Sequence, residues 1–118
     1  MIKTIAYIGV ALALLAIVGC GDSTPVAPPG LVITSTSPIT LSWNVVLAAT
    51  SYNIYRGTVS GGLSSKTLLA TNAPAGNQSP STTFTDTTVT TGVTYYYQVT
   101  AVNWDKESAP SNEVSVTP

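Results

Sequence analysis

The sequence predicts an all-β protein, an antiparallel sandwich of seven short strands behind a helical N-terminal segment. Three observations lead to this fold class. Ser, Thr, Gly and Pro are abundant, whereas the Glu, Lys and Arg that cover soluble helices are scarce and only 8% of residues are charged. After residue 30, short runs alternate apolar and polar residues, and turn-forming residues separate them at the spacing of a sandwich. The chain of 118 residues is long enough for one such domain.

The expected strands are the runs in which apolar residues recur at every second position. Ile39, Leu41 and Trp43 share one face of a strand, for example, because successive side chains point to opposite faces. Gly, Pro, Asn and Ser predict a turn at 59–62 and a loop at 72–81. The seven expected strands are 31–34, 39–43, 51–56, 66–71, 82–86, 94–103 and 112–117.

The longest run separates core aromatic residues from outward-facing ones. Tyr95 and Tyr97 fall on one apolar face, whereas Tyr96, Gln98 and Thr100 fall on the opposite face. Two of the three adjacent tyrosines are therefore expected to be structural. The expected core residues are Trp43, Tyr52, Ile54, Phe84, Tyr95, Tyr97 and Val99.

The N-terminal segment has the layout of a secretory signal peptide. Lys3 precedes an uncharged apolar run over 5–18. A helix of about 14 residues, at ~1.5 Å each, reaches roughly 21 Å, which is short of the ~30 Å hydrocarbon core of a bilayer. A cleaved helical signal peptide is therefore favoured over a permanent transmembrane helix.

The sequence "IVGC" at 17–20 resembles a bacterial lipobox. The resemblance implies cleavage between Gly19 and Cys20, and a covalent lipid on Cys20 that anchors the chain in a membrane. Cys20 is the only cysteine and follows a complete apolar run, and a thiolate is the nucleophile that the lipid transfer needs. The alternative is an ordinary signal peptide followed by a chance cysteine.

The lipobox interpretation divides the chain into a signal peptide (1–19), a lipidated, Pro-rich tether (20–29) and a β-domain (30–118). It predicts a bacterial cell-envelope protein whose domain lies outside the cytoplasm. By resemblance to known sorting rules, Gly21 after the lipidated residue favours the outer membrane if the cell is Gram-negative.

The β-domain resembles a fibronectin type III domain, an immunoglobulin-like sandwich. The resemblance rests on "LSWN", "SYNIYRGTVSGG" and "GVTYYYQVTAVNWDKESAPSNEVSVTP", and it covers about 26–118. It implies seven strands in sheets of three and four, and it makes Tyr95 the tyrosine corner, bonded to backbone just upstream. Thr91 stands where Pro is common, and the 72–81 loop is longer than usual.

Composition and motifs argue against several classes of function. The formal net charge of −1 provides no basic surface for nucleic acid. The sequence has no His, so no base is available to activate its serines and threonines, and no metal centre or cofactor is expected beyond the lipid on Cys20. Asp105 and Glu107 are close in sequence, but a small filled sandwich lacks the cleft that a carboxylate pair needs for glycoside hydrolysis. The sequence therefore predicts a protein that is not an enzyme.

The candidate binding residues lie in the 103–109 loop after the longest strand and, for Tyr55 and Tyr96, on the outward-facing side of the sheet. Trp104 is costly to leave in water and is of a type enriched at binding hot spots. It either forms a contact patch for a sugar or protein partner, or folds back over the sandwich end and caps the core. Two functions stay open: a lipid-anchored module that binds an envelope protein or polysaccharide, and a structural spacer or assembly subunit with no ligand. The candidate binding residues are Tyr55, Tyr96, Trp104, Asp105, Lys106 and Glu107.

Overall fold

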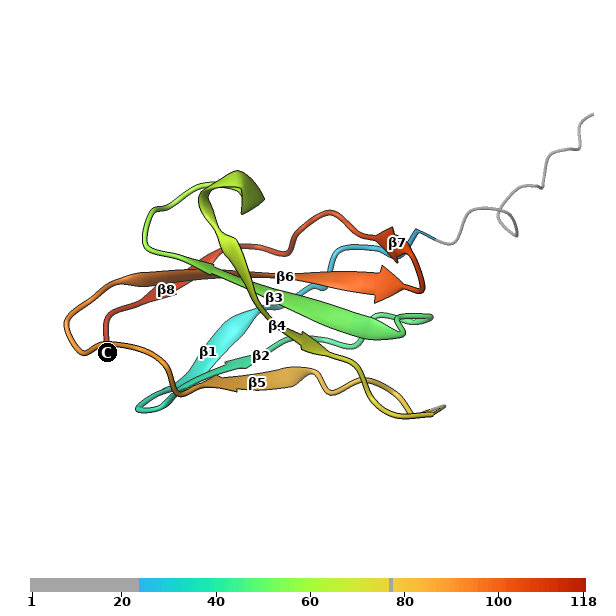
Figure 1. Ribbon diagram of the computed structural model, residues 1–118, viewed down its shortest axis with the longest axis horizontal. Coiled ribbons are helices and arrows are strands. Elements are labelled where there is room, and N and C mark those ends of the chain that lie inside the picture. Colours follow the sequence, from blue (N-terminus) through green and yellow to red (C-terminus); the bar gives the residue numbers. More distant parts are fainter. Residues whose placement is uncertain (1–23, 77) are drawn as a thin grey trace, which may run out of the picture.

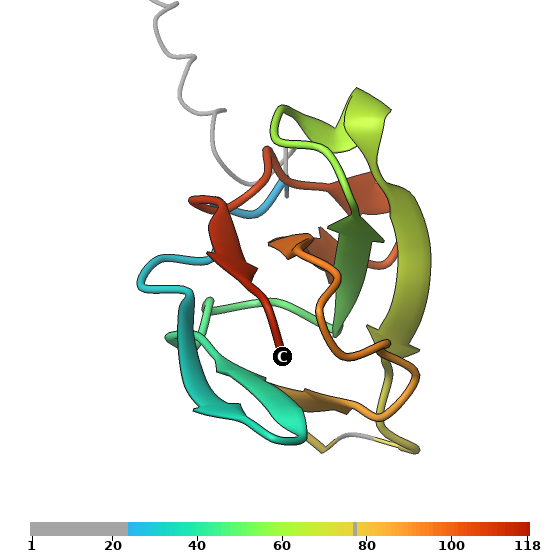
Figure 2. The same ribbon diagram turned by 90° about the vertical axis from the view of Figure 1, so that its left-hand side faces the viewer.

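The computed structural model describes residues 24–76 and 78–118. The expected signal peptide, its cleavage site between Gly19 and Cys20, and the first part of the tether lie outside these residues. The described chain forms two antiparallel sheets stacked face to face (Figures 1 and 2), as the all-β prediction requires. The elements are β1 (Val32–Thr36), β2 (Ile39–Ser42), β3 (Ser51–Gly57), the 3-10 helix η2 (Leu63–Ser65), β4 (Thr67–Asn72), β5 (Thr83–Asp86), β6 (Tyr95–Asn103), β7 (Lys106–Glu107) and β8 (Val114–Val116).

The last expected strand differs most from the prediction. The sequence predicts one strand over 112–117, whereas β8 is shorter and the additional strand β7 lies where a loop is expected. Both pair with β6, β7 at its C-terminal end and β8 at its start. The sheet orders are β1-β2-β5 and β4-β3-β6-β7, with β8 also on β6, so the expected three-plus-four arrangement gains one short strand.

Serine hydroxyls complete the edge of β6 between β7 and β8. The amide of Ala101 donates to Ser108 Oγ and the amide of Val99 donates to Ser111 Oγ, both at 2.9 Å. The amides of the two serines donate back to the carbonyl oxygens of Ala101 and Val99 at 2.8 Å. Pro110 has no amide hydrogen to donate. The chain therefore follows β6 in this stretch through paired bonds from a serine amide and a serine hydroxyl, without a continuous strand.

The same segment covers the outer face of β6. Gln98 and Thr100 point away from the core, as predicted, but both are buried. Gln98 Nε2 donates to the carbonyl oxygen of Ser111 at 2.9 Å, and Thr100 Oγ1 donates to the carboxylate of Glu107. Strand β6 is thus enclosed on both faces, which the sequence alternation does not reveal.

The core lies between the two sheets and contains the residues expected there. Six of the seven are buried, and Phe84 is half-buried against them. Trp43 meets Tyr52 edge to face with ring centroids 5.4 Å apart, and the amide of Val46 donates to Tyr52 Oη at 2.7 Å. The amide of Thr90 donates to the hydroxyl of Tyr95 at 2.8 Å, which is the geometry of a tyrosine corner.

A buried carboxylate joins the two sheets. Asp86 ends β5, and its side chain is only 1% exposed. Its Oδ2 accepts hydrogen bonds from Arg56 Nη1 on β3 at 2.8 Å and from Tyr97 Oη on β6 at 2.7 Å. Its Oδ1 accepts from both the amide and the hydroxyl of Thr88. All four bonds go to a charged acceptor, which makes them stronger than bonds between neutral groups.

These contacts shift the pKa values of the acid and of its tyrosine partner. Burial alone would raise the pKa of Asp86, but hydrogen bonds from Tyr97, Thr88 and Arg56 outweigh it and hold that pKa below its ordinary value. Burial, and next the hydrogen bond to Asp86, raises the pKa of the Tyr97 hydroxyl. Tyr97 therefore stays a protonated donor while Asp86 stays charged.

Replacing Asp86 with Asn should lower the free energy of unfolding by about 2–3 kcal/mol near neutral pH, because Arg56 and Tyr97 lose a charged partner. Since the pKa of Asp86 is lowered on folding, its stabilisation is present above its unfolded pKa of about 3.9 and is lost as pH falls through the folded value. Thermal denaturation from neutral pH down to about pH 2 should therefore show a smaller acid-induced loss in Asp86→Asn than in the wild type. Asp105→Asn is the matched control at an exposed carboxylate. Identical acid profiles for Asp86→Asn and the wild type would contradict this account.

Candidate functional site

Trp104 projects from the turn between β6 and β7. Its side chain is 82% exposed, so it does not cap the sandwich core and that alternative does not hold. Its backbone has a φ of 56°, and its amide donates to Thr50 Oγ1 at 2.9 Å. The same hydroxyl donates to the carbonyl oxygen of Val102 at 3.1 Å, and the Thr50 amide donates there at 2.7 Å. Thr50 thus fixes the turn that presents the indole.

An open groove of about 460 Å³ lies beside Trp104. Its size falls in the range of about 300–1,000 Å³ that is usual for ligand sites. Three segments form its wall: the loop between β2 and β3, the long loop between β4 and β5, and the β6–β7 turn. These meet at one end of the sandwich, where the first described segment, 24–30, also lies (Figure 1). The lining residues are Ala48, Ala49, Thr50, Ser51, Ala73, Pro74, Gly76, Gln78, Ser79 and Trp104.

Backbone strain is concentrated at this groove. Among the described residues other than glycine, Ala48 and Trp104 have positive φ, and both line it. A left-handed backbone costs a residue with a Cβ atom roughly 1–2 kcal/mol. Strained residues cluster at binding sites, where surrounding contacts hold them in place. The exposed indole of Trp104 buries little apolar area and so adds little to the stability of the fold.

Comparisons with known proteins support the fold and the domain type. No family model matches the chain. The chain is 48% identical over 87 residues to an amylopullulanase of Thermoanaerobacter thermohydrosulfuricus. This match covers 73% of this chain and 5% of that enzyme. It is also 40% identical over 94 residues to a poly(3-hydroxybutyrate) depolymerase of Ralstonia pickettii. That match covers 77% of this chain and 16% of that enzyme. The match therefore spans only a small part of each enzyme.

A solved structure decides the family. The Fn3-like protein from Clostridium thermocellum is 40% identical, with a TM-score of 0.66, and the match covers 81% of this chain and 96% of that protein. The chain belongs to the fibronectin type III family. Its relatives include domains of larger polymer-degrading enzymes, and the described domain itself shows no catalytic feature.

The candidate binding residues predicted from the sequence do not form one site in the fibronectin type III fold. Asp105 and Lys106 are exposed and follow Trp104 directly, but neither lines the groove. Tyr96 lies near the start of β6, eight residues from Trp104, which at about 3.3 Å per residue is roughly 26 Å away. Tyr96 and Trp104 therefore lie too far apart to contact the same sugar ring or side chain.

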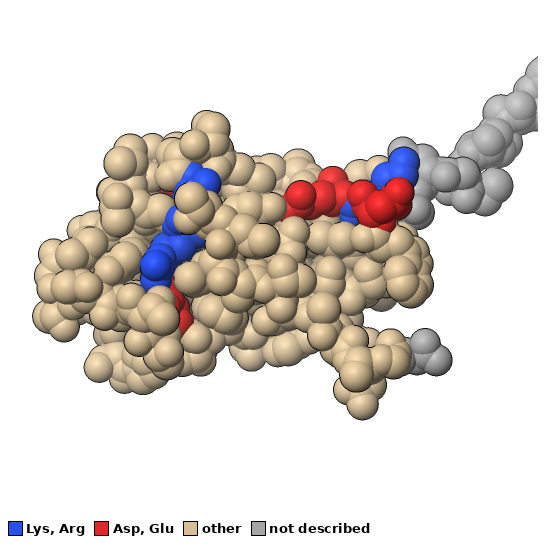
Figure 3. Space-filling model, in the orientation of Figure 1, with Lys and Arg blue, Asp and Glu red and all other residues tan. Residues whose placement is uncertain are grey.

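Glu107 and Tyr55 belong to an internal network on the outer face of the larger sheet. Glu107 lies in strand β7, where the sequence predicts a loop. Its Oε2 accepts from Tyr55 Oη at 2.6 Å, from Asn53 Nδ2 at 3.1 Å and from Thr100 Oγ1. Burial alone would raise the pKa of Glu107, but these hydrogen bonds, led by the one from Thr100, lower it. Both residues are committed to this network. Figure 3 shows the acidic and basic atoms near β7 as one patch beside an otherwise uncharged end.

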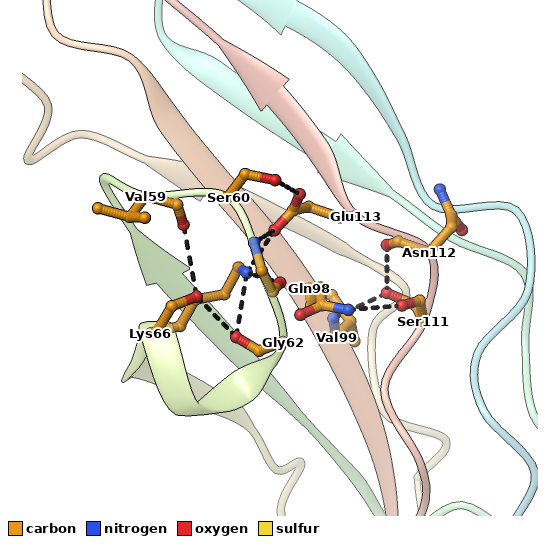
Figure 4. A network of polar contacts seen from close by, with 11 residues as sticks. Val59, Ser60, Gly62, Lys66, Gln98, Val99, Ser111, Asn112 and Glu113 are labelled. Atoms are coloured by element: carbon orange, nitrogen blue, oxygen red, sulfur yellow. Dashed lines mark hydrogen bonds and ion pairs between the residues drawn. The ribbon is translucent and has the colours of Figure 1, made fainter.

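A second polar cluster, around Lys66 and Glu113, has a structural role (Figure 4). Lys66 Nζ is fully buried, forms an ion pair with Glu113 Oε2 and donates to the carbonyl oxygen of Gly61 at 2.6 Å. Ser60 Oγ and the Gly61 amide donate to the same carboxylate. The hydrogen bond from Lys66 is the largest cause of the lowered pKa of Glu113. The cluster ties the β3–β4 connection to the segment before β8 and leaves neither charge for a ligand.

Of the groove residues, the sequence alone indicates only Trp104. The unusual length of the 72–81 loop was the available signal, since this loop supplies Ala73, Pro74 and Gln78 to the groove wall. Residues 48–51 also line the groove because of the strained turn at Ala48, and no sequence motif indicates that turn. In the part of the chain that the structure describes, no group of three or more Cys, Asp or Glu residues could hold a metal ion. Within that same part, no helix is long and apolar enough to span a membrane.

Two variants, Trp104→Gly and Trp104→Ala, test both the backbone strain at this position and the contribution of the indole to folding. Both changes remove the exposed side chain, but only Gly relieves the positive φ, so the Gly variant should be more stable by about 0.5–1 kcal/mol. Denaturant unfolding measures this difference, and Leu47→Ala, at another exposed position of the same end, is the control. A loss above about 2 kcal/mol in both Trp104 variants would mean that the indole packs on the domain.

Proposed function

We propose that this chain is a non-catalytic, lipid-anchored module of the bacterial cell envelope that binds a glycan in the groove beside Trp104. The observation that carries the proposal is the exposed indole, held in a strained backbone at the wall of an open groove. An indole has a broad apolar face and one N–H donor. That face matches the apolar C–H face of a pyranose ring, and the polar groups around the groove match its hydroxyls.

The other chemical groups of the domain favour binding over catalysis. Asp86, Glu107 and Glu113 are each held by several internal hydrogen bonds, which leaves Asp105 as the exposed carboxylate among the described residues that has no such network. One carboxylate cannot supply the acid and base pair of a glycosidase. The relatives named amylopullulanase act on polymers as much larger enzymes, which supports an accessory role for this module.

The proposed lipid on Cys20 would determine on which side of the domain, relative to the membrane, the groove lies. The described chain starts at the end of the sandwich that bears the groove (Figure 1). An anchor upstream of this point would place the groove on the membrane-proximal side of the domain. The module would then hold a glycan close to the envelope surface.

A tryptophan titration tests glycan binding. The mature chain with Cys20→Ser and Trp43→Phe keeps Trp104 as its sole tryptophan. Trp43 Nε1 is buried without a hydrogen-bond partner among the described residues, so Phe at this position loses no hydrogen bond. Adding pullulan should shift the emission of Trp104 to the blue in a saturable way, because the sugar removes water from the indole.

The matched control is the Trp104→Ala variant, in which Trp43 is kept. Because this variant lacks the Trp104 reporter, its binding is measured by affinity electrophoresis, where it should no longer be retained by pullulan. Granules of poly(3-hydroxybutyrate) provide a comparison with an apolar polymer, which is not expected to shift the emission. An unchanged emission with pullulan and with other common polysaccharides, together with unaltered migration, would contradict glycan binding. That result would favour the spacer or assembly function instead.

The lipid anchor has a separate test. Expression of the full chain in a bacterium should yield a membrane-bound protein that begins at Cys20 and carries the added mass of a diacylglycerol, because the lipobox directs both steps. Two acyl chains, at about 0.8 kcal/mol per buried CH₂, hold a protein on a membrane stably. The Cys20→Ser variant should lack the added mass, and it should be released from the membrane fraction without detergent. A wild-type protein that is cleaved but carries no lipid would contradict the anchor.

A further inference from the structure

The wall of the groove carries no charged side chain. Its lining residues are small, hydroxyl or amide residues together with Trp104. The nearest charges in the sequence, Asp105 and Lys106, have opposite sign and lie outside the lining set. Figure 3 shows the end of the sandwich below the charged patch as an uncharged surface. No lining residue would supply a cation to pair with a carboxylate or sulfate group in this groove.

Uncharged hydrogen-bonding groups are available at the same place. The side chains of Ser51, Gln78 and Ser79 line the groove and make no side-chain hydrogen bond within the described residues. A hydroxyl donates one hydrogen bond and accepts up to two, and an amide both donates and accepts. This set matches the hydroxyls of a sugar, which also donate and accept. A carboxylate, by contrast, only accepts and requires charged or multiple donors when water is removed.

We infer that the groove selects an uncharged glycan chain over an acidic one, with one pyranose ring on Trp104 and its hydroxyls on Ser51, Gln78 and Ser79. This inference rests on the proposed glycan binding and specifies the class of glycan. The selectivity comes from exclusion: an acidic sugar loses hydration on entering the groove and gains no ion pair in return.

The experiment compares a neutral and an acidic oligosaccharide of equal length. The probes are an α-1,4-linked glucose hexamer and an α-1,4-linked galacturonate hexamer, titrated at low salt into the mature chain with Cys20→Ser and Trp43→Phe while Trp104 emission is recorded. The glucose hexamer should bind at least about tenfold more tightly. Equal or tighter binding of the galacturonate hexamer would overturn the inference but leave glycan binding in place. Failure of both probes would overturn the inference and the proposed function together.

A charge placed in the groove provides a second readout. Gln78→Lys should tighten binding of the galacturonate hexamer by about tenfold and narrow the ratio between the probes, because the ammonium group supplies the missing cation. Ser115→Lys adds the same charge on β8, where its strand partner is Tyr96 at the far end of β6, and should leave the ratio unchanged. An equal effect of both lysines would show that net charge, and not the groove, controls selection.

Discussion

The hydrogen-bonded carboxylate of Asp86 is the interaction on which the arrangement of the two sheets depends. Most of the contact between the sheets is apolar packing, which is strong but has no fixed direction. At the β4 and β5 edge, Asn72 Nδ2 also donates to the carbonyl oxygens of Ser81 and Thr83. Asp86 extends from the smaller sheet to Arg56 and Tyr97 on the larger one, so it fixes how the sheets lie on each other. The guanidinium of Arg56 also lies 5.0 Å from the centre of the Tyr95 ring, which connects the charged cluster to the tyrosine corner. A domain without a disulfide thus gains directional contacts within its core.

With the sheets fixed in this way, the opposite end of the sandwich is free to carry irregular structure. The tyrosine corner and the Asp86 cluster lie toward the start of β6, whereas Trp104 follows its C-terminal end. There the backbone is strained at Ala48 and Trp104 and is held by the hydroxyl of Thr50. Local strain of this kind is sustained only when surrounding contacts over-determine it. The hydrogen-bonded half of the domain therefore offsets the local backbone strain at the end that bears the groove.

The sequence predicts the sandwich well because its signals are local. Alternation in 94–103 correctly assigns Tyr95 and Tyr97 to the core, and the length of the 72–81 loop marks a segment that lines the groove. The remaining features depend on contacts between distant residues. Whether Trp104 points outward is set by Thr50, which lies 54 positions earlier. Between β7 and β8, the hydroxyls of Ser108 and Ser111 accept from the β6 amides in place of backbone carbonyl oxygens, and alternation does not encode such bonds.

The two tryptophans allow one direct measurement on the wild-type domain. In a nitrogen–proton correlation spectrum, each indole N–H gives its own signal, one from buried Trp43 and one from exposed Trp104. During titration with a neutral glucose oligosaccharide, binding beside Trp104 should shift the Trp104 signal in a saturable way while the Trp43 signal stays in place. No shift of either signal, or an equal shift of both, would contradict a glycan site at this end of the sandwich.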